Sequence, residues 1–255
     1  MAIVRHAMAT ALVLALALAA CGGDAKTTAS AAGPRSVAIL VYHHLGDPPP
    51  GERNPSLYVT PERFRATVAA LDRSGFQAVT LGRVWAAWHG TGRLPRRPVV
   101  LSFDDGYAEQ DTVARPALAA RGWPGTMNLE LGRLDAPGGL STAAIGRMRR
   151  AGWEIDDHTV THPDLTRVSA QRLAAEVGGS RAQFRRRLGV DPRFFCFPYG
   201  RANAAVRAAV RTAGFLAATT IEPRLATPRD NPYALPRIVV RRAATPAEVA
   251  HLAGG

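Results

Sequence analysis

The chain has 255 residues, 47% of them hydrophobic, and a formal net charge of +12 at pH 7. This length is enough for one sizeable core, and beyond the N-terminal region no hydrophobic stretch is long enough to span a membrane, so we expect a soluble body. The charge alone would suit a nucleic acid partner, which we exclude because the arginines are scattered along predicted helices without interleaved stacking aromatics. Attraction to anionic envelope polymers or lipid headgroups is the alternative use of this charge.

The first 35 residues are typical of an export signal followed by a tether. Arg5 precedes a short apolar run over residues 11–18, and Leu18-Ala19-Ala20-Cys21 resembles a bacterial lipobox. We expect a signal peptide over 1–20, lipid on Cys21, a flexible tether over 21–35 and a folded domain over 36–255. The protein would then be exported and anchored to a bacterial membrane, facing the periplasm or the cell exterior. The alternative is an ordinary signal peptide with an incidental cysteine.

Strand-like and helix-like segments alternate through the rest of the chain. Buried strands are expected at 36–42, 77–80, 98–103, 125–129, 153–156, 194–197, 215–220 and 238–240. Helices are expected at 60–75, 81–88, 109–121, 141–152, 169–188 and 203–213, with Thr60 and Ser169 as N-caps. Repeated strand–helix units with continuously apolar strands favour a parallel sheet, and seven or eight units favour a closed barrel over an open sheet.

Two short motifs carry candidate metal ligands and a candidate base. His158-Thr159-Val160-Thr161-His162 places two imidazoles four positions apart, and Phe103-Asp104-Asp105-Gly106 supplies carboxylates from a distant segment. Two imidazoles and one carboxylate suit a divalent metal of the zinc type with open positions for water and substrate. Asp104 would lie beside the metal-bound water as a general base. The alternative is that the histidines pack on a helix and the aspartates form a turn.

The candidate site residues share one position relative to the predicted strands. Asp104, His158, Tyr199 and His43 all come just after the carboxyl end of a strand. In a barrel of parallel strands these ends meet on one face, where barrel enzymes place their chemistry. We therefore expect a single active site at the carboxyl ends of the strands.

Three motifs resemble those of polysaccharide deacetylases of carbohydrate esterase family 4, which share the NodB homology domain. Ser102-Phe103-Asp104-Asp105-Gly106 is similar to that family's first motif, the segment from His158 to His162 to its second, and Phe197-Pro198-Tyr199-Gly200 to the end of its third. The likeness covers residues 36–242 as one domain. It implies an α/β fold, a distorted (β/α) barrel of seven strands, and metal-dependent removal of N-acetyl groups from an amino-sugar polysaccharide of the cell envelope or exopolysaccharide.

The resemblance also implies a role for each matching residue. Asp105, His158 and His162 would hold the metal, which we expect to be zinc, with cobalt, nickel or iron as alternatives. Asp104 would be the base for the attacking water, and the backbone N–H of Tyr199 would help to stabilise the tetrahedral oxyanion. Pro198 and Tyr199 would contact the substrate.

The chain departs from the family pattern at positions that matter for catalysis. Cys196 stands where the third motif usually has the arginine that pairs with the catalytic aspartate, and the closing Leu-x-His is replaced by Leu235-Pro236-Arg237. Similar losses, with Tyr42-His43-His44 kept, occur in the branch that resembles poly-N-acetylglucosamine deacetylases. The departing amine needs an acid, so we predict that a histidine of this pair, His43 in the first place, donates the proton. The alternative is that His43 only orients Asp104 or a loop.

One further departure and two other functions stay open. Asp156-Asp157 replaces the small residues that usually precede the first ligand histidine, and would either support the ligands from behind or lie on the barrel rim. The protein could instead be a non-catalytic glycan-binding lipoprotein, or a metal-dependent hydrolase of an O-acetyl ester or a non-sugar amide. Retention of Asp104 and the full ligand set favours catalysis. We expect an acetylated amino-sugar polymer and, through the lipid, a membrane as partners of a monomer.

Overall fold

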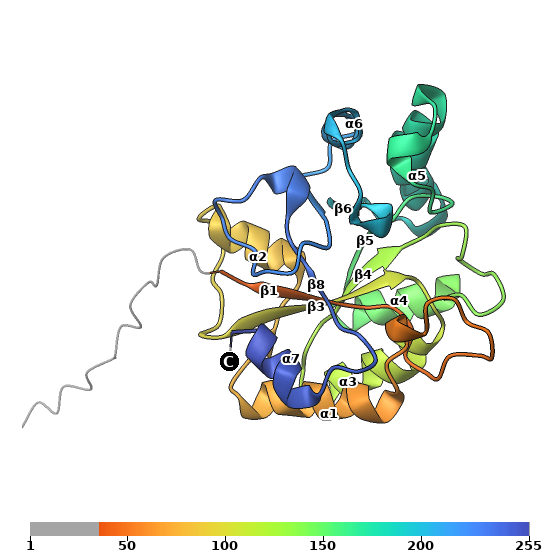
Figure 1. The fold of residues 1–255 in the computed structure, drawn as a ribbon. Helices are drawn as coiled ribbons and strands as arrows, with labels where there is room; N and C mark the ends of the chain where they lie inside the picture. Colours follow the sequence, from red (N-terminus) through yellow and green to blue (C-terminus); the bar gives the residue numbers. More distant parts are fainter. Residues whose placement is uncertain (1–35, 255) are drawn as a thin grey trace, which may run out of the picture. The chain divides into compact units, whose positions relative to one another are not determined.

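The computed structural model describes residues 36–254, which belong to one compact unit, Pro34–Gly255. Its strands are β1 (Ala38–Tyr42), β2 (Gln77–Ala78), β3 (Pro98–Asp105), β4 (Thr126–Leu129), β5 (Glu154–Asp157), β6 (Phe194–Cys196), β7 (Ala217–Thr219) and β8 (Ile238–Val239). Its helices are α1 (Pro61–Arg73), α2 (Leu81–Trp88), α3 (Arg115–Ala119), α4 (Thr142–Arg150), α5 (Ala170–Leu188), α6 (Ala204–Thr212) and α7 (Pro246–Leu252). The expected signal peptide, Cys21 and the tether lie outside the described residues. Figure 1 shows the strands at the centre with the helices around them.

The strands form one parallel sheet that curls into a distorted barrel. Their order is β7-β6-β5-β4-β3-β1-β8, so the predicted path of seven strands is confirmed. The short β2 pairs with the first residues of β3, and β4 pairs with its later residues along the same edge of β3. Closure is incomplete, because in residues 36–254 the two outermost strands share no ladder and only the bridge between Thr219 and Leu235 links β7 to the segment before β8. The barrel is therefore a half-barrel and not the fully closed one that the unit count favoured.

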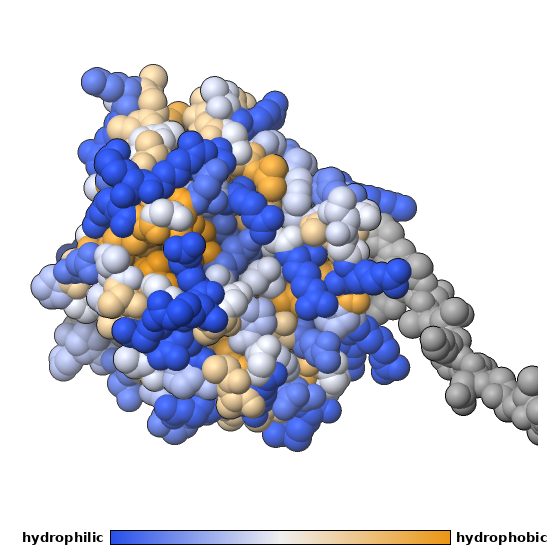
Figure 2. Space-filling view, turned by 180° about the vertical axis from the view of Figure 1, so that it is seen from behind, coloured by the Kyte–Doolittle hydropathy of each residue, from blue (hydrophilic) through white to orange (hydrophobic). Residues whose placement is uncertain are grey.

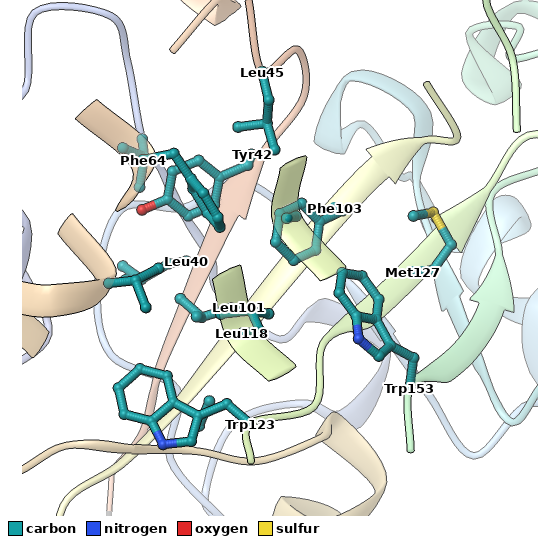
Figure 3. Packing of buried hydrophobic residues seen from close by; sticks show 14 of the residues in the cluster. Leu40, Tyr42, Leu45, Phe64, Leu101, Phe103, Leu118, Trp123, Met127 and Trp153 are labelled. Carbon is teal, nitrogen blue, oxygen red and sulfur yellow. The ribbon is translucent and has the colours of Figure 1, made fainter. Parts of the chain in front are cut away.

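Both faces of the sheet are buried, as the continuously apolar strands predict. Ile39 of β1 packs in a cluster with Val100 and Phe194, whereas its neighbour Leu40 belongs to the larger cluster on the opposite face. Figure 3 shows part of that larger cluster, where Phe103 packs close to other aromatic side chains. Full burial of a side chain of this size stabilises the fold by about 2–3 kcal/mol. Packing on both faces holds the strands, and with them their carboxyl ends, in fixed positions.

The predicted helix starts are confirmed at both expected caps. The hydroxyl of Thr60 accepts a hydrogen bond from the N–H of Arg63 at 3.2 Å, and Ser169 accepts one from Arg172 at 3.3 Å. Helix α7, which packs against α1, was not predicted, because seven residues are too few for a clear apolar period. None of the helices described here has the length and apolarity that a membrane span requires.

The segment predicted as one helix over 109–121 begins instead with a π-helical turn, Gln110–Ala114. The side chain of Gln110 is fully buried and donates to two backbone carbonyls, at 2.8 Å to His43 and at 2.7 Å to Asp104. These bonds join the ends of β1 and β3. The π-helical turn therefore positions Gln110 for a tertiary contact, which the spacing of apolar residues could not predict.

Figure 2 shows one face on which hydrophilic side chains predominate, with smaller apolar areas between them. In the part of the chain that the structure describes, four large hydrophobic side chains are exposed, namely Tyr199, Leu216, Ile221 and Leu252. Two of them, Tyr199 and Ile221, line the same cavity. Part of the exposed apolar surface therefore lies at the mouth of this cavity.

Candidate active site

A cavity of about 640 Å³ lies at the carboxyl ends of the strands. The predicted site residues that line it are His43, Asp104, Asp105, His158, His162 and Tyr199. They follow or end β1, β3, β5 and β6, so the expectation of one site on this face is confirmed. Pro198 is buried and does not line the cavity, so its predicted contact with substrate has no support in this geometry.

The three predicted metal ligands converge on one point. The Nε2 atoms of His158 and His162 are 3.1 Å apart. Oδ1 of Asp105 lies 3.4 Å from Nε2 of His158 and 3.6 Å from Nε2 of His162. A tetrahedral zinc ion with bonds of about 2.05 Å would hold neighbouring ligand atoms about 3.3 Å apart. The three atoms therefore have the spacing that such an ion requires.

The chemistry of these groups also fits a metal. Oδ1 of Asp105 is buried without a hydrogen-bond partner, which costs free energy unless a cation binds it. Burial opposes ionisation of Asp105, but the histidines around it hold the pKa of this carboxyl well below its usual range. Burial lowers the pKa of His162 to about 4, so near neutral pH its Nε2 can bind a metal. The residues present thus fit a divalent metal of the zinc type.

Hydrogen bonds from two neighbouring elements hold the loop that carries both histidines. Nδ1 of His158 lies 2.8 Å from the carbonyl O of Cys196 on β6, which directs Nε2 into the site. One carboxylate oxygen of Glu176 on α5 accepts the N–H groups of Val160 and Thr161, each at 2.9 Å. The segment is a loop and not a helix, so the helix-packing alternative for the histidine pair is wrong.

Of the two carboxylates before His158, Asp157 supports this loop and Asp156 binds the neighbouring strand β6. Oδ1 of Asp157 accepts the N–H of Thr159 at 2.8 Å and the hydroxyl of Ser180 at 2.7 Å. Oδ1 of Asp156 accepts the N–H of Phe194 at 3.1 Å. Both carboxylates are fully buried, so the interpretation that they lie on the rim is wrong. Burial also raises the pKa of Asp157 to about 7.

Asp104 is held by a buried arginine that directly precedes β8, two strands from β3 in the sheet. Nη1 of Arg237 donates to Oδ1 of Asp104 at 2.8 Å and Nη2 donates to Oδ2 at 2.9 Å. Asn128 adds a bond to Oδ1 at 2.7 Å. Burial opposes ionisation of Asp104, but Arg237 and then His158 outweigh it and keep the pKa of Asp104 far below its usual range. Asp104 is therefore an oriented, ionised carboxylate.

Sequence reasoning missed Arg237. The arginine that usually pairs with the catalytic aspartate was expected at the position of Cys196, and its absence there suggested that the pair was lost. Instead, the small Cys196 side chain leaves room for the guanidinium, whose Nη2 lies 3.0 Å from Sγ. The signal available in the sequence was an arginine directly before an apolar strand, one of the few arginines adjoining a strand and not a helix. Asp104, Cys196 and His158 also form a possible metal set, but Arg237 already binds the first two of these.

The two histidines after β1 have different surroundings. His43 lines the cavity with its Nε2 3.9 Å from Oδ2 of Asp104, and its Nδ1 is buried without a hydrogen-bond partner. Burial lowers the pKa of His43, while Asp104 and Asp105 oppose this shift. Of the pair, His43 is therefore the side chain that can reach a bound substrate.

His44 is fixed in the wall beside the cavity. Its ring lies between those of Tyr58 and Tyr107, with centroids 3.9 Å and 3.5 Å away. Its Nδ1 is 3.0 Å from Oε1 of Glu109. These contacts leave His44 a packing role.

Tyr199 stands on the rim in an unusual backbone conformation. Its φ is 57°, in the left-handed region, and its side chain is 54% exposed. The ring packs edge-on against His162 at 4.7 Å between centroids, and the hydroxyl donates to the carbonyl O of His162. The following Gly200 also has a positive φ, and a Cβ there would lie 2.4 Å from the Ile221 side chain. The turn is thus built to present an aromatic face beside the ligand histidines.

The family follows from a comparison with known proteins. The sequence profile named Polysaccharide deacetylase matches residues 91–218, which include Asp104, Asp105 and both ligand histidines. The chain belongs to the polysaccharide deacetylase family. It is thus a member of a family of hydrolases, and the resemblance noted in its motifs is confirmed.

Curated relatives are distant. The chain is 25% identical over 207 residues to the putative polysaccharide deacetylase YxkH of Bacillus subtilis, covering 81% of this chain and 72% of YxkH. It is 24% identical over 244 residues to the poly-beta-1,6-N-acetyl-D-glucosamine N-deacetylase of Escherichia coli K12, of which it spans only 36%.

Solved structures share the fold. The deacetylase PplD of Streptococcus pyogenes superimposes with a TM-score of 0.80 at 23% identity, over 86% of this chain and 99% of PplD. A polysaccharide deacetylase from Bacillus cereus gives 0.76 at 21% identity, over 86% of this chain and 69% of the other. At these identities the likeness concerns the fold, and it supports the distorted barrel.

Proposed function

We propose that this polysaccharide deacetylase is a metal-dependent N-deacetylase, which removes acetyl groups from an amino-sugar polymer of the cell envelope or exopolysaccharide. The observation that carries the proposal is the convergence of Asp105, His158 and His162 beside the ionised Asp104. The metal, zinc by its donor set, would be held by these three residues and would polarise the acetyl carbonyl and lower the pKa of water. The N-deacetylase named among the relatives from E. coli supports cleavage of an amide.

The chain's own residues supply the proton transfers. Asp104, held by Arg237, accepts a proton from the water whose oxygen attacks the acetyl carbon. When the carbon–nitrogen bond breaks, the amine nitrogen needs a proton, and His43 is the proposed donor, supported by its position 3.9 Å from Asp104. The proton taken from water thus has a short route to the amine. Acetate and a free amino sugar are the products, and the backbone N–H of Tyr199 is the proposed donor to the developing oxyanion.

Release of acetate tests this function. The purified protein is given N-acetylated and O-acetylated oligosaccharides and a non-sugar acetamide, before and after chelation and after zinc is restored. Acetate from N-acetylated sugars that stops on chelation and returns with zinc supports the proposal. Acetate mainly from the ester or from the non-sugar amide would indicate the other hydrolase. Binding of glycan without any acetate release would indicate a non-catalytic protein.

We also propose that Cys21 is lipidated and anchors a monomeric enzyme at the outer face of a bacterial membrane. The support is the Leu18-Ala19-Ala20-Cys21 motif and the small, polar residues that follow it. The intact mass of the native protein tests this, and an unmodified Cys21 would contradict it. A Cys21→Ser variant is expected to stay out of the detergent phase on partitioning.

A further inference from the structure

The charged side chains that remain available around the cavity are arginines. The lining contains the cations Arg133, Arg201, Arg237 and Arg241 and the carboxylates Asp104, Asp105 and Glu130. Each carboxylate is already engaged. Asp104 binds Arg237 at 2.8 Å, Asp105 faces the ligand histidines, and Glu130 binds Arg133 at 3.1 Å. The same two pairs occupy Arg237 and Arg133, so the positive charge left for an incoming glycan comes from Arg241 and, in part, from Arg201.

Arg241 is the clearest of these cations. Side chains two apart on a strand point to the same face, and Arg237, Val239 and Arg241 accordingly all line the cavity. Arg237 lies buried against Asp104, whereas Arg241, which follows β8, is exposed. Its Nη1 donates to the hydroxyl of Ser56 at 3.1 Å, and within residues 36–254 it forms no ion pair. The guanidinium of Arg241 is thus held at the groove by the neutral hydroxyl of Ser56 and keeps its charge uncompensated.

Two other features of the rim point the same way. Arg201 follows the Tyr199 turn, and its side chain stays 60% exposed although Nη1 binds Asp164 at 2.7 Å. A guanidinium has five N–H donors, so one ion pair leaves others for a ligand. By contrast Arg242, the neighbour of Arg241, does not line the cavity and binds Asp47 at 2.7 Å. Of these two neighbouring arginines, the one that lines the cavity forms no ion pair with the described residues, and the one with an ion pair lies outside the lining.

On the basis of the proposed N-deacetylase function, we propose that the substrate is an acidic glycan. Its carboxylate or phosphate groups lie near the acetylated sugar, and Arg241 binds one of them while the acetamide is at Asp104. An arginine-lined groove gains affinity from such groups, whereas it would repel a neutral polymer once its amines are freed and protonated. Arg241 is then a residue that sets specificity and takes no part in the chemistry.

The test compares three oligosaccharides of equal length. One is a neutral N-acetylglucosamine oligomer, one alternates N-acetylglucosamine with a uronic acid, and one joins N-acetylglucosamine units through phosphodiesters. Acetate release is measured for the wild type, Arg241→Gln and the matched control Arg242→Gln, at low and high ionic strength. The two anionic compounds show whether carboxylate or phosphate is the group recognised.

The proposal expects the wild type to prefer one anionic oligosaccharide by about 10-fold in kcat/KM, the usual scale of one charged hydrogen bond. High salt and Arg241→Gln should remove the preference by raising KM, with kcat and the neutral oligomer little changed, and Arg242→Gln should match the wild type. Equal or better use of the neutral oligomer, unaffected by Arg241→Gln, would overturn the proposal while leaving the deacetylase function intact. If no compound releases acetate, the deacetylase function fails, and calorimetric binding of the same compounds decides the charge preference.

Discussion

On the β5 side of the cavity, the two ligand histidines lie four positions apart in one loop. On the opposite side, Arg237 directly precedes β8 and His43 directly follows β1. In the sequence these two residues lie near opposite ends of the domain. These two strands are neighbours in the sheet, with Leu40 paired to Ile238. One side is therefore assembled within a short segment of chain, and the other only by the folding of the whole sheet.

The two sides also differ in what holds them. Around the ligand loop, backbone N–H groups donate to buried carboxylates on β5 and α5. Several hydrogen bonds therefore fix the backbone that carries both histidines. On the other side, Arg237 binds Asp104 across 133 positions of sequence, while His43 Nδ1 has no partner. We expect the ligand side to control metal binding and the β8–β1 side to control turnover by a metal-loaded enzyme.

The largest effect is expected from His158→Ala. Removal of one of three ligands should abolish stoichiometric metal binding and acetate release together, because the remaining two groups cannot hold the ion. Metal content by mass spectrometry and acetate release measure this. A variant that keeps both would contradict the proposed metal centre.

Arg237→Gln should reduce kcat by about 100-fold or more while leaving metal content intact, the scale expected when a catalytic group is displaced by about 1 Å. Asp104 would lose its orienting partner, and breaking a buried ion pair costs about 3–5 kcal/mol in free energy of unfolding. Denaturant unfolding measures the stability, and Arg237→Lys is the conservative control. Since lysine cannot bind both carboxylate oxygens, it should restore stability better than turnover. Loss of metal in Arg237→Gln would contradict the expectation that the β8–β1 side controls turnover without controlling metal binding.

His43→Ala should reduce kcat by about 100-fold, the usual size of a general-acid contribution, with unchanged metal content and nearly unchanged stability. The measurement is steady-state acetate release by the zinc-loaded variant. A rate within a few-fold of the wild type would mean that another group protonates the amine.

Glu176→Gln should act on the ligand side without touching a ligand. Its carboxylate orders the loop between the histidines, so metal affinity should fall by about 10-fold, as for other groups that orient ligands, while the fully loaded enzyme turns over almost normally. Competition with a chelator measures the affinity. Glu62→Gln, which makes the same change to an exposed carboxylate on α1, is the control and should change little.

The smallest effect on catalysis is expected from His44→Ala. The ring contacts with Tyr58 and Tyr107 and the bond to Glu109 should contribute about 2 kcal/mol to the free energy of unfolding. Acetate release should change by no more than a few-fold. A loss of turnover as large as that of His43→Ala would contradict the separation of the two histidines.

The sequence alone determined the features that depend on short stretches of chain. Apolar runs and caps such as Thr60 defined most strands and helices, and the repeated units defined a parallel barrel with its site at one end. The candidate ligands His158 and His162, with Asp104 and Asp105, could be predicted from two motifs because each motif is local. Helix α7 was not predicted because its seven residues are too few to show a helical period of apolar side chains.

Only the tertiary structure decided how distant residues meet. Neither the pairing of Arg237 with Asp104 nor the space that Cys196 leaves for it could be read from either segment, because the contact depends on β8 lying beside β1. The choice between His43 and His44 depends on which face each side chain takes after β1, and two adjacent residues carry no periodic signal for that. Arg241 and Arg242 differ for the same reason, since the course of the chain after β8 directs one to the groove and the other to Asp47.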